Sequence, residues 1–444
     1  VYWRPKVSLP PPPARIFPLN WVWIKTNMLS IRRSPLRGFW NACSDYVAPK
    51  TWDLTVQTTD VNQTFTVDIN AGLNPNVNVD WDDGTVETFT TTGQKTHTYS
   101  SAGIYKIRIG ASFTSGGNIR FGSDAENKHR LKKTSIIPFI KGLTNFSSTF
   151  NGCTGLSGSI PADLFRYNTL VSTSGFYGTF FGCSGLTGSL PTDLFRYNPL
   201  VSTGGFSQTF QGCTGLTGSL PADLFRYNTL VSTSGFYATF SGCSGLTGSL
   251  PADLFRYNTQ VSTSGFYATF SGCSGLTGSL PSDFFRYNTQ VSTYGFCVTF
   301  AGCTGLTGSL PTDLFKYNTL VSINGFFQTL LNCTGLTGSI PSDFFRYNTL
   351  VSASGFSQTF RACTKLSLSP NIFGPPEEYA TRFLNTPSNF TNCFYNTGTL
   401  AAKGTAPALW LYDYGTETPV KTGCFYGQTT NTVTNFADIP ADWK

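Results

Sequence analysis

Residues 235–264 read GFYATFSGCSGLTGSLPADLFRYNTQVSTS, and nearly the same text recurs every 30 residues through more than half of the chain. A fixed period of this length is the signature of a solenoid, in which each repeat buries its apolar face only against its neighbours. A cysteine marks the period. These cysteines are Cys153, Cys183, Cys213, Cys243, Cys273, Cys303, Cys333, Cys363 and Cys393. Stacked copies present a broad surface, and this favours a binding role over chemistry.

Length and composition set the class of protein. A chain of 444 residues exceeds one ordinary core, so two or three domains are expected. Only 12% of the residues are charged and 15% are aromatic, and this composition predicts an ordered chain. No apolar run approaches the roughly 18 residues that a membrane span needs. The first residue, Val1, is compatible with the removal of an initiator or leader.

Residues 1–50 differ from the rest in charge. They hold eight bases and one acid, so 8 − 1 = +7, which equals the net charge of the whole chain. Pro10 to Pro13 form a stiff polyproline stretch. A basic arm on a neutral body is typical of a segment that docks on an acidic partner or a larger assembly, such as a virion or an envelope. Nucleic acid is not favoured, because no nucleic-acid-binding fold accompanies the arm. The docking residues are predicted to be Arg4, Lys6, Arg15, Trp21, Trp23, Lys25, Arg32, Arg33 and Arg37.

Residues 51–112 alternate Thr and Val with polar residues. This is the pattern in DLTVQTT, FTVDIN, VNVDWDDG, VETFTTT and YKIRIGA, and it predicts a small antiparallel β-sandwich. The segment 113–134 is rich in Gly and Lys and is predicted to be a linker. The leucine-rich repeats are then expected over 135–374, with degenerate repeats and a C-terminal cap over 375–444.

The stretch VDWDDGTVETF…HTYSSAGIYKIRI resembles the PKD family of immunoglobulin-like sandwiches. The family's usual Gly-Asp-Gly turn is Asp-Asp-Gly here, which keeps the turn glycine. The resemblance implies a structural spacer of surface proteins with no catalytic role, and a structural role for the histidine. The matching residues are Trp81, Asp83, Gly84, His97, Tyr99, Gly103 and Tyr105.

One repeat divides at its turn-forming residues. LTGSL suits a short strand, and Pro221 opens a brief helical turn, PADLFRYN, with Leu224 and Phe225 facing inward. FYATF is expected to form a second short helical piece. A column of phenylalanines should hold the stack together, with neighbouring rungs about 4.8 Å apart. That column is Phe150, Phe180, Phe210, Phe240, Phe270, Phe300 and Phe360, with Leu330 once in their place.

The unit F-x-G-C-T/S-G-L-T-G-S-L/I-P resembles leucine-rich repeats, especially the BspA-like class of bacterial and phage surface proteins. That class is associated with adhesion, and the resemblance implies contact with a protein or glycan. The final segment, from GCFYGQTTNTVTNF onward, is similar to the closing segment of repeat proteins of tailed phages. The fold class is therefore expected to be mainly β with short helices, a PKD/Ig-like sandwich followed by a leucine-rich-repeat solenoid. Fold by itself does not settle the ligand.

Two columns of reactive side chains are interpreted as structural. The cysteines are expected to form a buried row, because a regular column seldom supplies disulfide geometry. Each Asp of the repeats, such as Asp223, has a base three residues later, such as Arg226, and these are expected to pair. With two histidines and no CxxC pair, no metal site or cofactor is predicted. No catalytic fingerprint occurs, so the protein is predicted not to be an enzyme.

A binding face is expected where the copies differ. They differ directly after each Gly-Phe and two residues before each Cys. Exposed aromatic rows at these positions would suit sugar rings or a protein partner, while tolerant surface sites are the alternative. The candidates are Tyr177, Phe181, Gln208, Gln211, Tyr237, Tyr267, Phe327, Gln358 and Arg361.

These observations predict an extracellular, non-enzymatic binding protein on a virion, as a fibre or capsid-decorating protein, or on a bacterial surface as an adhesin. A purely structural coat or filament subunit, assembled through its solenoid as a homo-oligomer, is the alternative, since near-identical repeats suit regular packing.

Overall fold

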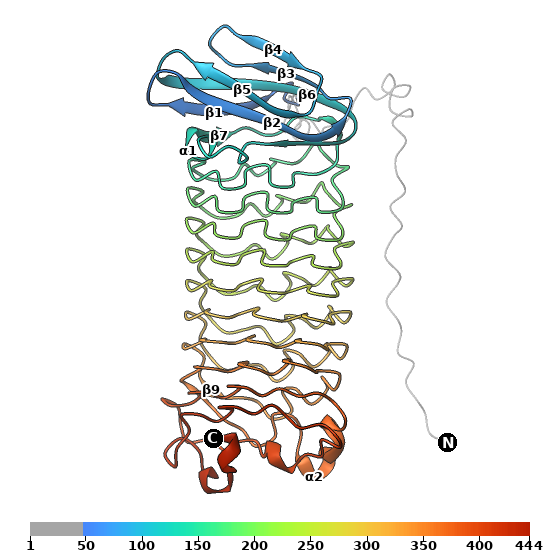
Figure 1. Ribbon diagram of the computed structural model, residues 1–444, viewed down its shortest axis with the longest axis vertical. Helices are drawn as coiled ribbons and strands as arrows, with labels where there is room; N and C mark the ends of the chain where they lie inside the picture. The colour runs from blue at the N-terminus through green and yellow to red at the C-terminus, as the bar shows by residue number, and fades with distance from the viewer. Residues whose placement is uncertain (1–47) are drawn as a thin grey trace, which may run out of the picture. The chain divides into compact units, whose positions relative to one another are not determined.

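The computed structural model describes residues 48–444, and residues 49–444 form one compact unit. The predicted docking residues from Arg4 to Arg37 lie outside the described residues. The regular secondary structure is mainly β, with a few short helices. Figure 1 shows a β-sheet (blue) followed by a long stack of similar rungs (green to orange).

Six antiparallel strands begin the described chain. The first half of β6 pairs with β1 and β3, and its second half pairs with β2, so this one strand joins both groups of strands. Trp52, Trp81 and Tyr99 are fully buried among them. Each of the five alternating segments predicted as strands overlaps a strand, although WDDG (81–84) and TTT (90–92) lie beyond the ends of β3 and β4. The six are β1 (Trp52–Thr58), β2 (Gln63–Leu73), β3 (Asn76–Asp80), β4 (Val86–Phe89), β5 (Gly93–Tyr99) and β6 (Gly103–Arg120).

The predicted linker, 113–134, is instead part of the sheet. Strand β6 continues to Arg120, and β7 (Leu131–Thr134) pairs with β1 after the short helix α1 (Asn127–Arg130). The buried Asn127 side chain accepts from the Thr66 N–H and donates to the Phe121 carbonyl, both at 2.9 Å. The Gly and Lys residues suggested a linker, but buried residues between them pack the segment against the sheet. Strand β8 (Lys141–Leu143) also pairs with β6.

We divide the stack into eight rungs that begin at residues 145, 175, 205, 235, 265, 295, 325 and 355. The first nine residues of each rung form a ribbon. Phe176, Gly178 and Phe180 each donate a backbone N–H to the next rung, at 2.8–2.9 Å, while Tyr177 and Thr179 donate to the carbonyl three residues back. Every fourth residue has a positive φ, as at Gly178 (56°) and Gly182 (67°). The ribbon is therefore neither a helix nor a strand.

The two helical pieces expected in each repeat are thus turns. In PADLFRYN the backbone bonds link residues three apart, as from Leu224 N–H to the Pro221 carbonyl, and no helix continues from them. The side-chain directions were predicted correctly, since Leu224 and Phe225 are buried. The predicted strand LTGSL is reduced in most rungs to isolated bridges or turns, with a two-residue pair, β9 (Gly338–Ser339) and β10 (Leu366–Ser367), near the end of the stack.

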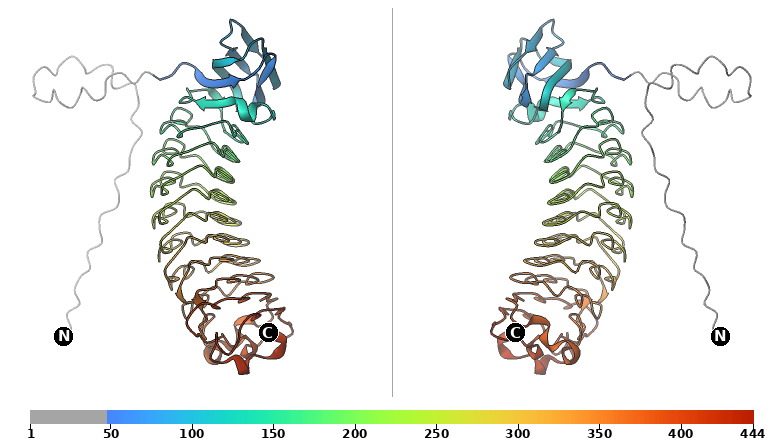
Figure 2. Two further views of the ribbon diagram at one scale, coloured as in Figure 1. Left: turned by 90° about the vertical axis from the view of Figure 1, so that its left-hand side faces the viewer. Right: turned by 90° about the vertical axis from the view of Figure 1, so that its right-hand side faces the viewer.

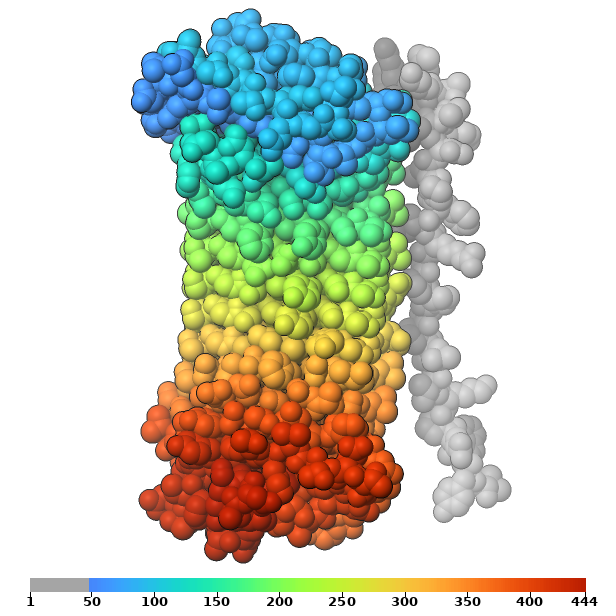
Figure 3. Space-filling view, viewed as in Figure 1, coloured from blue at the N-terminus to red at the C-terminus, as the bar shows by residue number. Residues whose placement is uncertain are grey.

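Phenylalanine rings fill the stack in three columns instead of the single predicted one. The predicted column is confirmed as buried, including Leu330. A second contains Phe165, Phe195, Phe225, Phe255, Phe285, Phe315 and Phe345, and a third contains Phe146, Phe176, Phe206, Phe236, Phe266, Phe296, Phe326 and Phe356. Figure 3 shows neighbouring rungs in contact along the whole stack.

Buried polar side chains connect each rung to the one before it. Thr239 Oγ1 donates to the Phe206 carbonyl at 2.8 Å, and Cys243 Sγ donates to the Phe210 carbonyl at 2.9 Å. Burial raises the pKa of the Cys243 thiol to about 12, so the thiol stays protonated and can donate. The buried row of free cysteines is confirmed, with the thiol acting as a hydrogen-bond donor as well as a small apolar group.

The ninth cysteine of the series does not belong to this column. Phe390 stacks on Phe356 and Phe394 on Phe360, so the eighth rung spans 34 residues instead of 30. Cys393 consequently takes the threonine position, and Thr397 Oγ1 donates to the Phe360 carbonyl as the cysteines do. The register of the stack therefore slips at the eighth rung, although the 30-residue spacing of the cysteines continues to Cys393.

The C-terminal segment adds further turns to the stack and ends on it. Trp443 is buried, and its ring lies 6.0 Å from that of Phe390 and 6.4 Å from that of Phe425. Apolar side chains of the last rung are therefore covered by the end of the chain. The helices of this segment are α2 (Pro376–Tyr379), η1 (Ala380–Phe383), η2 (Leu409–Leu411), η3 (Phe436–Asp438) and η4 (Ala441–Trp443).

The stack is curved (Figure 2). Ring centroids are 4.6 Å apart between Tyr237 and Tyr267 on the ribbon, 5.7 Å between Phe240 and Phe270, and 6.0 Å between Phe225 and Phe255 on the far side. Backbone hydrogen bonds hold the ribbons at about the 4.8 Å spacing of paired strands, while rings separate the opposite edge. The ribbon therefore lies on the inner side of the curve.

Candidate binding face

The outward residues of the ribbon make up the face where the copies differ. We define the ribbon face as the third, fourth and seventh residues of each rung, such as Tyr237, Ala238 and Ser241, although short side chains at these positions, such as Ala238 at 3% exposure, are buried. The sixth residue and the ninth point into the core, as Phe240 and Cys243 do. All nine residues predicted for ligand binding are ribbon-face residues, so the structure places them on one side of the stack.

The predicted tyrosines are the most regular feature of this face. Tyr177 is 41% exposed. The Tyr237 and Tyr267 rings stack with a 6° angle between their planes, and each is partly buried. Arg361 Nη1 donates to Gln358 Oε1 at 2.9 Å. The other predicted residues lie partly buried on their own rungs: Phe181, Gln208, Gln211 and Phe327.

The expected exposed aromatic row is interrupted. Ser207, Cys297 and Ser357 occupy the third position of their rungs and are 5%, 3% and 4% exposed. These side chains are too short to extend beyond the backbone of the ribbon. Burial raises the pKa of Cys297 to about 12, and its hydrogen bond with Tyr267 opposes that shift. Aromatic side chains on this face are therefore separated by small residues instead of forming a continuous row.

A second aromatic group was missed by the sequence analysis. The Tyr395 and Tyr426 rings stack at 4.7 Å, and the Arg361 guanidinium lies 4.9 Å from the Tyr395 ring centre. Tyr395 and Tyr426 directly follow Phe394 and Phe425, which continue the ring column of Phe360 beyond rung 8, so both tyrosines correspond to the seventh residue of a rung. The matching texts NCFYN and GCFYG are a sequence signal that could have revealed the pair.

The opposite edge of the stack carries paired charges. Each Asp predicted to pair with the base three residues later does so, at 3.2–3.7 Å. Each base also lies over the tyrosine of the next rung, as Arg226 does over Tyr257 at 5.3 Å. The buried Asn228 donates from Nδ2 to the Asn198 and Phe195 carbonyls. We call this segment, DLFRYN in rung 3 and its counterparts, the charged edge.

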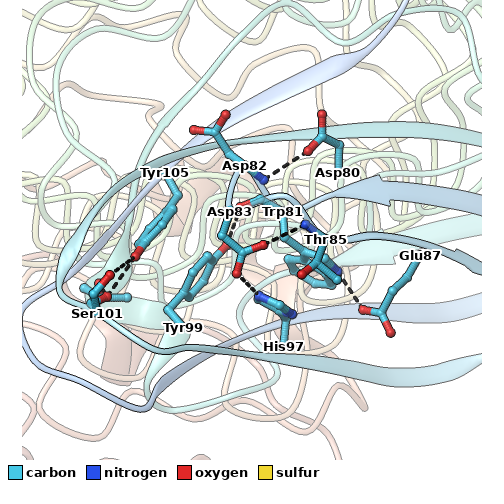
Figure 4. Close-up of polar contacts among 11 residues, drawn as sticks. Asp80, Trp81, Asp82, Asp83, Thr85, Glu87, His97, Tyr99, Ser101 and Tyr105 are labelled. Atoms are coloured by element: carbon cyan, nitrogen blue, oxygen red, sulfur yellow. Dashed lines mark hydrogen bonds and ion pairs between the residues drawn. The ribbon is translucent and has the colours of Figure 1, made fainter.

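The sheet holds a histidine–carboxylate pair with structural surroundings. His97 Nε2 and Asp83 Oδ2 are 2.7 Å apart, and the imidazole stacks on Trp81 at 4.8 Å. Tyr99 O–H donates to the Trp81 carbonyl at 3.2 Å (Figure 4). Burial raises the pKa of Asp83, but hydrogen bonds from His97 and Thr85 outweigh it, so the pKa lies below its ordinary value. The pair fixes the turn after β3.

Beyond the ribbon face, the described residues include a cavity but no group of potential metal ligands. Residues 48–444 contain no cluster of His, Cys, Asp and Glu able to hold a metal ion. In the same range, no helix is long and apolar enough to span a membrane. A cavity of about 260 Å³ lies where β7 meets the first rung, between Lys133, Ile160 and Phe180. None of the predicted binding residues lines it.

No family model matches the chain, and no curated protein or solved structure matches it either.

Proposed function

We propose that this chain is a non-enzymatic, surface-displayed binding protein that contacts a glycan or protein of a host surface. In this proposal, residues 51–134 are a PKD-like immunoglobulin-type sandwich and the rungs are a leucine-rich-repeat solenoid of the BspA-like class. Residues 1–50 dock the protein on a virion, as a fibre or capsid-decorating protein. The bacterial envelope, with the chain as an adhesin, is the alternative setting.

The observation that carries this proposal is where the copies differ. Within each rung, buried residues and the charged edge are nearly constant, because every rung must fit the next. Tyr, Ser, Cys and Phe interchange at the third position of the ribbon face, and Ser, Gly, Gln, Ala and Val at the fourth. Positions outside this face also differ, as at Ser234, Tyr294 and Asn324, but the seventh position of the ribbon face changes at nearly every rung, which supports recognition there.

The test is binding of the full chain to intact candidate host cells, before and after enzymatic removal of their surface glycans. Saturable binding that falls at least tenfold in Tyr237→Ala/Tyr267→Ala supports the proposal. The matched control is Tyr257→Ala/Tyr287→Ala, which removes two tyrosines from the charged edge of the same two rungs. Equal binding by both variants contradicts a role for the ribbon face.

A structural coat or filament subunit is a second candidate, favoured by an apolar row beside the charged edge. These leucines are 40–53% exposed and lie in one column that Gln260 and Gln290 interrupt, a pattern suited to side-by-side packing of copies. Concentration-dependent assembly in analytical ultracentrifugation, lost when the leucines become Gln, supports this candidate. A monomer at all concentrations contradicts it. The leucines are Leu170, Leu200, Leu230, Leu320 and Leu350.

A further inference from the structure

The ribbon face is almost free of charge. From Ser147 to Arg361, its third, fourth and seventh positions hold hydroxyl, amide, aromatic and small side chains with the aliphatic Val298 and Leu331, and Arg361 is the one ionised residue among them. Anionic or cationic partners are normally met by opposite charge, because complementary potentials set register and the rate of association. The composition of this face therefore favours a neutral partner that offers hydrogen bonds.

Side chains on this face are kept at a conformational cost. At the fourth position φ is 57° at Gln208, 50° at Ala238 and 60° at Val298, a left-handed region that costs a non-glycine residue about 1–2 kcal/mol. Gly178 shows that glycine fits this position. The eighth position has the same conformation and holds glycine in rungs 1–6, as at Gly242 (75°), with Asn332 and Ala362 in rungs 7 and 8.

Non-glycine residues held in the left-handed backbone region are a reason to look for function. A left-handed glycine at both positions would relieve the strain throughout the ribbon. The fourth position instead varies among Gln, Ala and Val, and it lies beside the third position that carries the tyrosines. The side chains at the fourth position are thus part of the face that the copies vary.

Rung 3 places amides beside an open aromatic ring. One face of Tyr237 is covered by Tyr267, so the other face points towards rung 3. There the third position is the small, buried Ser207, which cannot cover a ring, and Gln208 and Gln211 follow it. Gln211 Oε1 has no hydrogen-bond partner among the described residues. Tyr177 stands on the other side of the same rung.

We propose that the ribbon face of rungs 2–5 binds a neutral carbohydrate chain. A sugar ring presents C–H groups that pack on an aromatic face and hydroxyls that pair with amides and hydroxyls. Tyr237 and Tyr177 supply the aromatic contacts, and Gln208 and Gln211 supply the hydrogen bonds. This inference rests on the proposed function and names the ligand class of the same face.

The experiment measures binding of neutral oligosaccharides to the full chain. A panel of glucan, mannan and galactan oligosaccharides, with sulfated glucan as the charged comparison, is titrated by saturation-transfer NMR and calorimetry. We expect a neutral member to bind and the sulfated one not to bind better. Tyr237→Ala/Tyr267→Ala and Gln208→Ala/Gln211→Ala should each weaken binding at least tenfold, while Tyr257→Ala/Tyr287→Ala leaves it unchanged.

Thermal unfolding of every variant checks that the rungs remain folded. Binding that survives both ribbon-face variants overturns the inference, as does the absence of binding to every neutral oligosaccharide at millimolar concentration. If host cells are bound through the ribbon face but no neutral oligosaccharide competes, the proposed function stands and the carbohydrate inference fails. If cell binding is unaffected by the ribbon-face variants, both fail.

Discussion

The two sides of the stack are held together by different forces, although one 30-residue unit encodes both. On the ribbon side, backbone N–H groups bond directly from rung to rung. At the charged edge of rungs 2–5, the backbone bonds stay within the rung, so Phe rings, Asn side chains and Arg–Tyr contacts connect the rungs.

This difference explains which side is free to vary. Where backbone hydrogen bonds connect the rungs, the outward side chains are not needed for that connection and can change from copy to copy. Where side chains make the connection, each substitution removes a contact to two neighbouring rungs. Near-constancy at the charged edge is therefore expected from packing alone, and variation on the ribbon face is what the backbone permits.

Alkaline pH should have the largest effect on stability, and it should act on the ribbon side more than on the charged edge. Eight buried thiols form the cysteine column of the ribbon side, and burial raises the pKa of Cys243 to about 12 from an ordinary 9.0. Because folding raises the thiol pKa, the free energy of unfolding keeps its full value below pH 9. It falls as the pH rises from 9 towards 12, because the thiol ionises first in the unfolded chain. Each thiol should lower the free energy of unfolding by about 1.4 kcal/mol per pH unit in that window.

The check is chemical unfolding under reducing conditions from pH 8 to 11. Cys243→Ser/Cys273→Ser removes two thiols and should reduce the slope of unfolding free energy against pH by about two thiols' share. An unchanged slope would show that ionisation of these cysteines does not cause the loss of stability at alkaline pH.

The buried asparagines of the charged edge, such as Asn258, should contribute more to stability than the buried threonines of the ribbon, such as Thr239. Asn258→Ala removes two donated bonds at a charged edge that has no backbone connection between rungs, and we expect a loss of about 2–4 kcal/mol. Thr239→Ala removes one bond where backbone bonds persist on either side, and about 1–2 kcal/mol is expected. Urea unfolding of both variants measures the difference. Equal losses would mean that the two sides are held in the same way.

Exchanging glycine and alanine between two ribbon positions tests the strain. Ala238→Gly should stabilise the chain by about 1 kcal/mol, because glycine adopts a φ of 50° without steric cost. Gly242→Ala should destabilise it by a similar amount at a φ of 75°, although an added Cβ meets its nearest neighbour only at an ordinary 3.6 Å. Thermal unfolding measures the change in stability of both variants. If Ala238→Gly destabilised the chain, the backbone at this position would not be strained.

Substitution of the exposed ion-paired and tyrosine side chains of the charged edge should have the smallest effect. Arg256 pairs with Asp253 and lies over Tyr287, but all three are exposed to solvent and screened by it. Arg256→Gln should lower the melting temperature slightly, and the difference should shrink in 1 M salt. A double-mutant cycle with Tyr287→Leu isolates the contact between the two side chains. A loss as large as that of Asn258→Ala would contradict this ranking.

Much of the architecture could be predicted from the sequence because its causes are local or periodic. Alternation predicted the strands around Val56, Val67 and Ile107, and the 30-residue period predicted the stacking of Phe240 on Phe270. The i, i+3 spacing predicted the Asp223–Arg226 pair. Each of these needs only a side-chain direction and a neighbour at a known spacing.

The remaining features depend on contacts between distant residues, which no local pattern contains. Cys393 fits the period in sequence, yet Phe390 and Phe394 stack four residues out of register and move it to another column. The segment 113–134 resembles a linker until β7 pairs with β1. Tyr395 joins the ribbon face only because of the same slip.

The amino-acid sequence by itself determined that identical units stack, which side chains enter the core, and where copies differ. Tertiary structure decided how rungs connect, which tyrosines meet, and that the third, fourth and seventh positions share one nearly uncharged face. The physical reason is that periodicity fixes what each rung has in common, whereas hydrogen bonds between rungs depend on the register in which one backbone lies upon the next.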